Sequence, residues 1–432
     1  MPAIHDTIQA LGRRARLMAG AGLALSLGAA VSPASAVPAY GLLTTIAVPA
    51  AATNTAGTFV GYDLSVFDAT NQLYYLTDRS NNGIDVFSAK TNSYVTRIGS
   101  GLFSGATASG DNAGPNGIAL SDVAGGKLLI AGDGPSRFTT FNLASNGLTV
   151  VGAPRTTSTA VAGTPTPPNR VDGVAYSPTA NTILAANNAA DPGFVTLVNN
   201  ASGAVIRSIK LDGSGGYPNV NGDGVEATIF NTARNSFFVA VPVFNGAGAG
   251  GMIELDAATG NLLNTYDFNA LGLGGGCGPT GVAQGAGASM VVACGDNPTN
   301  QTIVFDPTGA GSIKTIPQVA GGDQVAFDPT RNLFFEAARF QAGGPVLGII
   351  DGATGSFLQS IPTSFNTHSV AVDPVSGEVF VALQASTAAN PNPFCTAGCI
   401  AVFAQTVPEP ASLPVMALAL VGLGVAVVRR RT

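Results

Sequence analysis

The residues whose side chains could best bind a ligand or catalyse a reaction stand at the start of several copies of a repeated segment. "DGVAYSPTANTILAANN" begins at Asp172, "DQVAFDPTRNLFFEAAR" at Asp323 and "HSVAVDPVSGEVFVAL" at His368. The side chains at this position in the copies form the candidate ligand or cation ring: Asn116, Asp172, Asp223, Asp323 and His368, with Thr280 in a further copy. Oxygen-bearing side chains are the ligands that Ca²⁺ takes in proteins, and an imidazole can move protons. Cation binding and acid–base catalysis are therefore the chemistries to weigh.

Three interpretations of this ring are open. Carboxylates near one axis repel one another unless a positive charge neutralises them, and a Ca²⁺ ion in the central channel would do so. Alternatively, Asp and Asn in tight loops hydrogen bond to neighbouring backbone N–H groups and have no further role. The third interpretation is direct catalysis by His368, but its place in a repeat favours hydrogen bonding or ligand binding. Carboxylates around this imidazole would favour its charged form, so we expect sensitivity to mildly acidic pH.

The repeated segments also show which elements must hold the ring. In each copy a short apolar strand, a polar turn and a second strand rich in β-branched or aromatic residues predict a hairpin. A second pair of strands follows, as in "GFVTLVNNASGAVIRSI" and "GMIELDAATGNLLNTYDF", so each unit is a four-stranded meander. Seven such units, spaced by 43 to 57 residues, predict an all-β fold: a seven-bladed β-propeller of four-stranded antiparallel blades.

The N-terminal region offers a strand that the last unit lacks. The seventh unit ends after its third strand, "CIAVFA", and "YGLLTTIAVPA" resembles the fourth strands. We therefore predict that residues 42–48 form the outer strand of blade seven, which closes the propeller and covers a free edge. The loops that join second to third strands open on the same side as the candidate ring. They bring further polar side chains to this face: Asp78, Arg79, Asp133, Asn187, Asp296 and Arg339.

The repeats resemble those of the YVTN/NHL family of seven-bladed propellers, and "DVFSAKTNSYVTRI" is the copy most similar to the YVTN repeat. The resemblance covers residues 40–405. It implies a propeller fold, and its motifs carry no catalytic residues. Because the chain has no Trp, the Trp-Asp signature of WD40 blades and the tryptophan docking motif of pyrroloquinoline-quinone propellers are excluded.

The four cysteines fall into two local pairs. Cys277 precedes the first strand of blade five and Cys294 ends the second strand, so the two lie opposite each other across a hairpin. Cys395 and Cys399 lie in the loop before the last strand. Local pairing, Cys277 to Cys294 and Cys395 to Cys399, is one of three connectivities. A zinc site is the alternative, but disulfides suit an exported protein.

Residues 1–36 have the pattern of a signal peptide. Three arginines precede an apolar run at residues 17–30, and the small residues Ala34, Ser35 and Ala36 follow it. Signal peptidase would cut after Ala36; the alternative is a retained N-terminal anchor. The β-propeller domain is accordingly expected at residues 37–406.

Residues 407–432 resemble a PEP-CTERM sorting signal, in which a Pro-Glu-Pro motif, an apolar helix and a terminal arginine cluster follow in order. The sorting motif comprises Pro408, Glu409, Pro410, Arg429, Arg430 and Arg431. Residues 411–428 predict a C-terminal transmembrane helix whose arginine end stays cytoplasmic. The resemblance implies recognition by an exosortase in a Gram-negative bacterium. The body would be periplasmic and membrane-anchored, or would be released to the cell surface or matrix after processing.

Charge and missing motifs narrow the function. Residues 37–406 contain 13 of the 19 Lys and Arg residues and 23 of the 25 Asp and Glu residues, a net charge of −10. Nucleic acid is therefore not an expected partner. One hypothesis is a noncatalytic binding or scaffold module that holds a polysaccharide, a protein or a small ligand on the loop-rich face. The other is a metal-dependent hydrolase or lyase, because related propellers include lactonases and streptogramin lyases. No nucleophile, base and orienting group are recognisable together, which favours the first.

Overall fold

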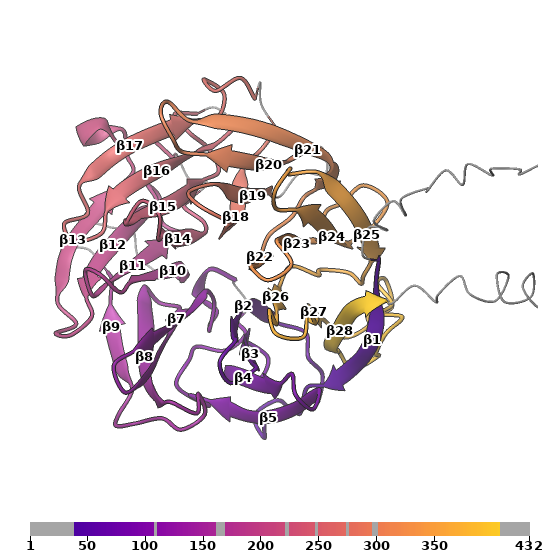
Figure 1. Cartoon of the computed structure of the whole chain (residues 1–432). Coiled ribbons are helices and arrows are strands. Elements are labelled where there is room, and N and C mark those ends of the chain that lie inside the picture. The colour runs from indigo at the N-terminus through magenta and orange to yellow at the C-terminus, as the bar shows by residue number, and fades with distance from the viewer. Residues whose placement is uncertain are drawn as a thin grey trace, which may run out of the picture. The chain divides into compact units, whose positions relative to one another are not determined.

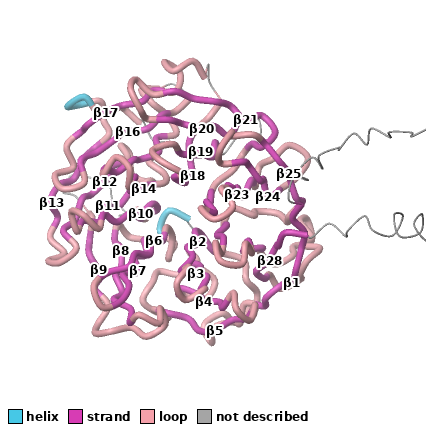
Figure 2. Tube along the Cα trace, in the orientation of Figure 1, coloured by secondary structure: helices cyan, strands magenta, loops and turns pink. Residues whose placement is uncertain are grey.

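The computed structural model describes residues 39–406, apart from 108–109, 161–168, 221–223, 247–248, 274–275 and 296–300. This part of the chain forms seven four-stranded antiparallel sheets, arranged as blades around a central axis (Figure 1). Two short 3₁₀ helices are the helical elements among the described residues (Figure 2): η1(Gly110–Asn112) and η2(Ser214–Gly216). The predicted all-β, seven-bladed β-propeller is confirmed.

Each blade is numbered from the innermost strand outward in chain order. Blades one to three consist of β2(Tyr62–Asp68), β3(Leu73–Asp78), β4(Gly83–Ser88) and β5(Ser93–Ile98); β6(Ile118–Val123), β7(Gly126–Asp133), β8(Arg137–Ala144) and β9(Arg155–Ser158); and β10(Val171–Ser177), β11(Thr182–Asn187), β12(Phe194–Asn199) and β13(Val205–Lys210). Blades four and five consist of β14(Thr228–Asn231), β15(Ser236–Val241), β16(Gly251–Asp256) and β17(Leu262–Asp267); and β18(Pro279–Gln284), β19(Met290–Cys294), β20(Gln301–Asp306) and β21(Ser312–Ala320).

Blade seven joins the two ends of the described chain. Blade six consists of β22(Val325–Asp328), β23(Leu333–Ala338), β24(Val346–Asp351) and β25(Phe357–Pro362), and blade seven of β26(Val370–Val372), β27(Val379–Leu383), β28(Cys399–Thr406) and β1(Ala39–Ala47). The indigo β1 lies antiparallel to the yellow β28, with Ala39 opposite Thr406 (Figure 1). The strand predicted at residues 42–48 therefore has its expected place, and it begins three residues earlier.

Apolar side chains on both faces of each sheet hold the blades together. All six residues of β3 are buried, and successive side chains of a strand point to opposite faces. Leu73 and Tyr75 accordingly pack against blade two, whereas Tyr74 and Leu76 pack against blade seven. A separate apolar cluster of this kind fills each of the seven interfaces between neighbouring blades in the described part of the chain. The central channel is the space that these clusters leave at the axis.

The turn between the first and second strands fixes the register of most blades. A residue at or next to the end of this turn has a left-handed backbone, which Asn tolerates better than most side chains and Gly adopts freely. These residues are Gln72 (φ 55°), Gly125 (82°), Asn181 (54°), Asn235 (53°), Asn332 (53°) and Gly377 (83°). In these six blades the sequence separation between the turn residue and the residue that faces the channel is the same.

Both predicted disulfides are present. Cys277 pairs with Cys294 across the hairpin of β18 and β19, and Cys395 pairs with Cys399 before the last strand. No cysteine is free. The zinc alternative is thereby excluded, because the thiols are already bonded to each other.

The terminal segments lie outside the described residues. These are the predicted signal peptide at residues 1–36 and the sorting segment at residues 407–432, with its motif and the helix expected at residues 411–428. Among residues 39–406, as far as they are described, no helix has the length and apolar character needed to cross a membrane.

Candidate functional site

The side chains at the start of the innermost strands meet at one end of the central channel. The six left-handed turn residues each lie nine positions after the channel-facing residue of their blade, and Thr280 is the counterpart in blade five by strand register. This set is called the channel ring below and comprises Asp63, Asn116, Asp172, Glu226, Thr280, Asp323 and His368. Five of these residues are among those predicted for the ring from the sequence, and Asp63 and Glu226 are not.

Blade four corrects the predicted ring. Asp223 lies outside the described residues, and the ring position of this blade is occupied by Glu226. The "DGV" at residues 223–225 resembles the start of blade three, but β14 starts only at Thr228, which pairs with Val239. The left-handed Asn235 could have shown this shift of three residues, because it lies nine positions after Glu226 and twelve after Asp223.

Neighbouring blades approach each other closely behind the ring. A Cβ atom on Gly117 would overlap the carbonyl oxygen of Asp172, and one on Gly281 would overlap that of Asp323, so only glycine fits at these two positions. Backbone hydrogen bonds also link the blades here: Ala227 N donates to Thr280 O (3.1 Å). The backbone that bears the ring side chains is therefore held in place by close contacts and hydrogen bonds between neighbouring blades.

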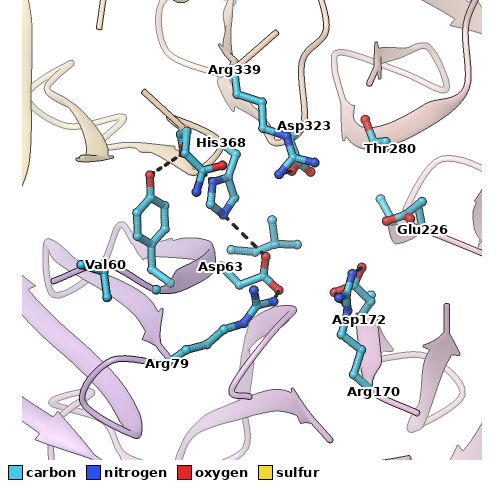
Figure 3. Close-up of a pocket in the computed structure, with 16 residues that line it drawn as sticks. Val60, Asp63, Arg79, Arg170, Asp172, Glu226, Thr280, Asp323, Arg339 and His368 are labelled. Atoms are coloured by element: carbon cyan, nitrogen blue, oxygen red, sulfur yellow. Dashed lines mark hydrogen bonds and ion pairs between the residues drawn. The ribbon is translucent and has the colours of Figure 1, made fainter. Parts of the chain in front are cut away.

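Six members of the channel ring line a cavity of about 310 Å³ at the mouth of the channel (Figure 3). Asn116 is not among the lining residues. Its Nδ2 donates to Ala113 O (2.9 Å) and Val171 O (3.1 Å), and its Oδ1 accepts from Arg79 (2.9 Å). Asn116 therefore has the structural role that tight-loop Asn residues commonly have.

Three arginines pair with the three aspartates of the ring. Arg79 Nη2 lies 2.6 Å from Asp63 Oδ2, Arg170 Nε lies 3.2 Å from Asp172 Oδ1, and Arg339 Nη1 lies 3.2 Å from Asp323 Oδ2 (Figure 3). Among the described residues there is no group of three His, Cys, Asp or Glu side chains arranged to hold a metal ion. The residues at the channel mouth therefore do not fit the Ca²⁺ site that the sequence suggested.

Two neighbouring carboxyl groups of the cavity differ in their protonation. Burial, followed by the carboxylate of Asp172, raises the pKa of Glu226 well above its ordinary range. Burial also acts against ionisation of Asp172, but the guanidinium groups of Arg170 and Arg79 outweigh it and lower the pKa of Asp172. Asn188 Nδ2 donates to Asp172 (2.7 Å) and lies 3.4 Å from Glu226 Oε1. These opposite shifts favour a proton on Glu226 and a negative charge on Asp172.

His368 is neutral, contrary to the expectation from sequence. Its side chain is buried, with 5% of its surface exposed, and its ring stacks on Tyr62 with 4.5 Å between the centroids. Nδ1–H donates to Asn366 O (2.6 Å), which leaves Nε2 3.8 Å from Asp63 Oδ1. Burial, and then the positive charge of Arg339, lower the pKa of His368 to about 3. The prediction of a mildly acid-sensitive, charged imidazole is therefore wrong, because burial and arginines outweigh the carboxylates.

The loops between second and third strands contribute only part of what was expected. Arg79 and Arg339 line the cavity. Asp78 instead accepts from the backbone and side chain of Asn81, Asp133 from Arg137, and Asn187 from Thr159, all outside the lining of the cavity. Asp296 lies outside the described residues.

Three of the Asp, Glu and Arg residues that line the cavity were not singled out in the sequence. Asp63 stands in the loosest copy of the repeat, although its left-handed Gln72 follows the common spacing. Glu226 was displaced by the misaligned Asp223. Arg170 precedes the ring position of blade three and has no counterpart in the other copies, so the repeat pattern carries no signal for it.

Comparison with known proteins supports the propeller fold but identifies no family and no function. No family model matches the chain. No curated protein sequence matches it either. Among solved structures 1217 chains match. One belongs to the crystal structure of the mitotic checkpoint complex; the match has 11% sequence identity and a TM-score of 0.57, and it covers 91% of this chain and 99% of that chain. At this identity the likeness shows a shared propeller fold alone.

Proposed function

We propose that this protein is an exported β-propeller of the YVTN/NHL type that binds a small polar ligand at its channel mouth without transforming it. The observation that carries the proposal is the cavity of about 310 Å³. Its walls hold three arginine–aspartate pairs together with Thr280, Glu226 and His368. Such fixed donors and acceptors around a concave site are what recognition of a polar molecule requires.

The hydroxyl groups of the lining favour binding over hydrolysis. Among the lining residues that the structure describes, Tyr62 and Thr280 are the two that carry hydroxyls. Thr280 Oγ1 donates toward Gly322 O (2.9 Å), and Tyr62 Oη lies 2.8 Å from Asn366 O. Neither contacts His368 through its oxygen in the way that an activated nucleophile contacts its base.

The proposed localisation of the protein rests on its terminal sequences and is supported by its cysteines. All four are paired, as expected in an oxidising compartment. We propose that signal peptidase removes residues 1–36 and that an exosortase recognises the PEP-CTERM segment at residues 407–432. The helix proposed at residues 411–428 would anchor a periplasmic body until processing releases it to the cell surface or matrix. The ligand would then be a component of that compartment, such as a sugar, with a polysaccharide or protein as the larger partner.

A ligand screen tests the binding function. The purified protein is heated with a library of monosaccharides, uronic acids, amino acids and nucleosides, and its melting temperature is recorded. A ligand at about 100 times its Kd should stabilise the native state by about 2.7 kcal/mol. The gain should vanish in Arg170→Gln and persist in Lys90→Gln, which changes an exposed charge on blade one. A gain that survives Arg170→Gln would place binding elsewhere.

Deletion of residues 407–432 tests the address. The full chain should fractionate with membranes, and the shortened chain should appear in the soluble periplasmic fraction. If the shortened chain still fractionates with membranes, the C-terminal segment is not its sole anchor.

A hydrolase or lyase is the second candidate, and one observation favours it. The pKa values of Glu226 and Asp172 are shifted in opposite directions, as in an acid–base pair. The described residues do not fit the metal-dependent form of this proposal. A panel of lactones, esters and polysaccharides, tested with and without Ca²⁺, decides the matter: turnover lost in Glu226→Gln would establish an enzyme.

A further inference from the structure

Asp63 stands at the meeting point of the charges in the cavity. Arg79 Nη2 lies 2.6 Å from one of its oxygens, and His368 Nε2 lies 3.8 Å from the other. Arg170, Asp172 and Asp323 act on it across the cavity. Its protonation therefore decides the net charge that an incoming ligand meets.

The other carboxyl groups of the cavity have protonation states that are set by arginines or by burial. Asp172 accepts from both Nε and Nη2 of Arg170 (3.2 and 3.4 Å), and Asp323 pairs with Arg339 (3.2 Å). His368 is neutral at pH 7, and burial raises the pKa of Glu226 well above its ordinary range and so favours its neutral form. Three guanidinium groups then face two committed carboxylates and Asp63. Among the described residues of the cavity, protonation of Asp63 then leaves one positive charge in excess.

Asp63 can make this change near neutral pH. Burial raises its pKa to about 7, even though Arg79 acts in the opposite direction. A carboxylate brought close to Asp63 would raise this pKa further, because like charges disfavour ionisation. Arg79 would then be shared between the ligand and a neutral Asp63, whose O–H can donate to the ligand.

We propose that the cavity binds a small hydroxyl-bearing carboxylate beside Arg79, and that Asp63 takes up one proton from solvent when the ligand enters. This inference rests on the proposed binding function and names its ligand class. The cavity has room for about ten water molecules, which is the scale of a single sugar acid. Thr280, Asn366, Asp172 and Glu226 also line it, and they supply partners for ligand hydroxyls.

Titration calorimetry with D-glucuronate tests the proposal, with D-glucose as the neutral control. Glucuronate should bind the purified protein about ten-fold more tightly at pH 6 than at pH 8, because the free protein must first protonate Asp63 at the higher pH. Glucose should bind more weakly and without this pH dependence. At pH 8 the measured heat should change with the ionisation enthalpy of the buffer and report the uptake of one proton.

Two variants locate the effect. Asp63→Asn should bind glucuronate equally at both pH values, without proton uptake, because the amide mimics the protonated carboxyl. Arg79→Gln should weaken glucuronate binding at least ten-fold, and Lys90→Gln should leave it unchanged. Circular dichroism spectra and melting curves check the fold of each variant. The buffer series on the unmodified protein tests proton uptake without relying on any variant.

Each contrary outcome has a distinct meaning. Equal binding of glucose and glucuronate would overturn the carboxylate class and leave the binding module intact. Glucuronate binding without pH dependence or proton uptake would overturn the role of Asp63. If glucuronate fails and another polar library member binds, the ligand class is wrong. If no library member binds, the proposed function itself fails.

Discussion

The channel mouth and the interior of blade one both bring carboxyl groups and an arginine together, yet only one of them borders a cavity. Inside blade one, Asp78 and Asp85 have no exposed side-chain surface, and Arg97 Nε donates to Asp85 (2.6 Å). Asn81 donates to Asp78 through its backbone (2.9 Å) and its side chain (2.5 Å). At the channel mouth the paired arginines and aspartates line open space instead.

The difference shows that a shifted pKa does not by itself mark a functional site. Burial raises the pKa of both Asp78 and Asp85, just as it raises that of Asp63. In blade one the protein itself satisfies the carboxyl groups, so the cluster stabilises the fold. At the channel mouth the same chemistry remains accessible to a ligand.

The largest effect is expected when the blade-one cluster is broken. Arg97→Met leaves Asp78 and Asp85 buried without their positive partner, so the free energy of unfolding should fall by about 4 kcal/mol. Guanidinium unfolding measures this loss. Lys90→Met, on the same blade but exposed, should change stability by less than about 0.5 kcal/mol. An equally small loss in Arg97→Met would mean that the cluster does not stabilise the blade.

A second test uses a buried carboxyl group that has no ligand role in this account. Glu336 contacts Thr302 (2.8 Å), and burial raises its pKa to about 8. The native state therefore holds this proton more tightly than the unfolded chain, so stability falls as pH rises from about 5 to about 8. Glu336→Gln should remove up to about 1.4 kcal/mol per pH unit of this slope and leave ligand binding unchanged. The free energy of unfolding of the unmodified protein and of Glu336→Gln is measured by denaturant unfolding across this pH range. An equal dependence of the two free energies on pH would contradict the prediction.

Replacing an arginine should lower the free energy of unfolding less at the channel mouth than inside blade one. The side chains of Arg170 and Asp172 border the cavity and keep 21% and 12% of their surfaces accessible, against 9% for Arg97 and none for Asp85. Water can therefore solvate Asp172 after Arg170→Met, and stability should fall by only about 1 kcal/mol. Ligand binding should nevertheless be lost. A loss of stability as large as that of Arg97→Met would make the two regions alike and remove the reason for assigning function to one of them.

The sequence carried most of the architecture because the fold repeats. Strand alternation, turn residues and the orphan strand at the N-terminus each point to the same seven blades. The paired cysteines also followed from that register, since Cys277 and Cys294 lie across one hairpin.

The electrostatics of the site could not be obtained in the same way. Arg79, Arg170 and Arg339 each pair with the ring aspartate of their own blade, but Arg170 has no counterpart in the repeat. The effect of these groups on Asp63 and Glu226 depends on the assembled channel, because residues of different blades face one cavity there. The burial of His368 against Tyr62 has the same origin. Glu226 could have been found, had the spacing to Asn235 been weighed above the "DGV" motif.

Arg79, Arg170 and Arg339 balance the aspartates of the channel ring, and this balance sets the electrostatics of the cavity. His368 reports on this balance, because Arg339 and Arg79 add to the effect of burial in lowering its pKa. Its NMR signals, assigned by comparison with His368→Gln, should show no titration between pH 5 and pH 8 and a pKa of about 3. An imidazole pKa at or above 6.5 would mean that unneutralised carboxylates dominate the channel mouth and would contradict the account.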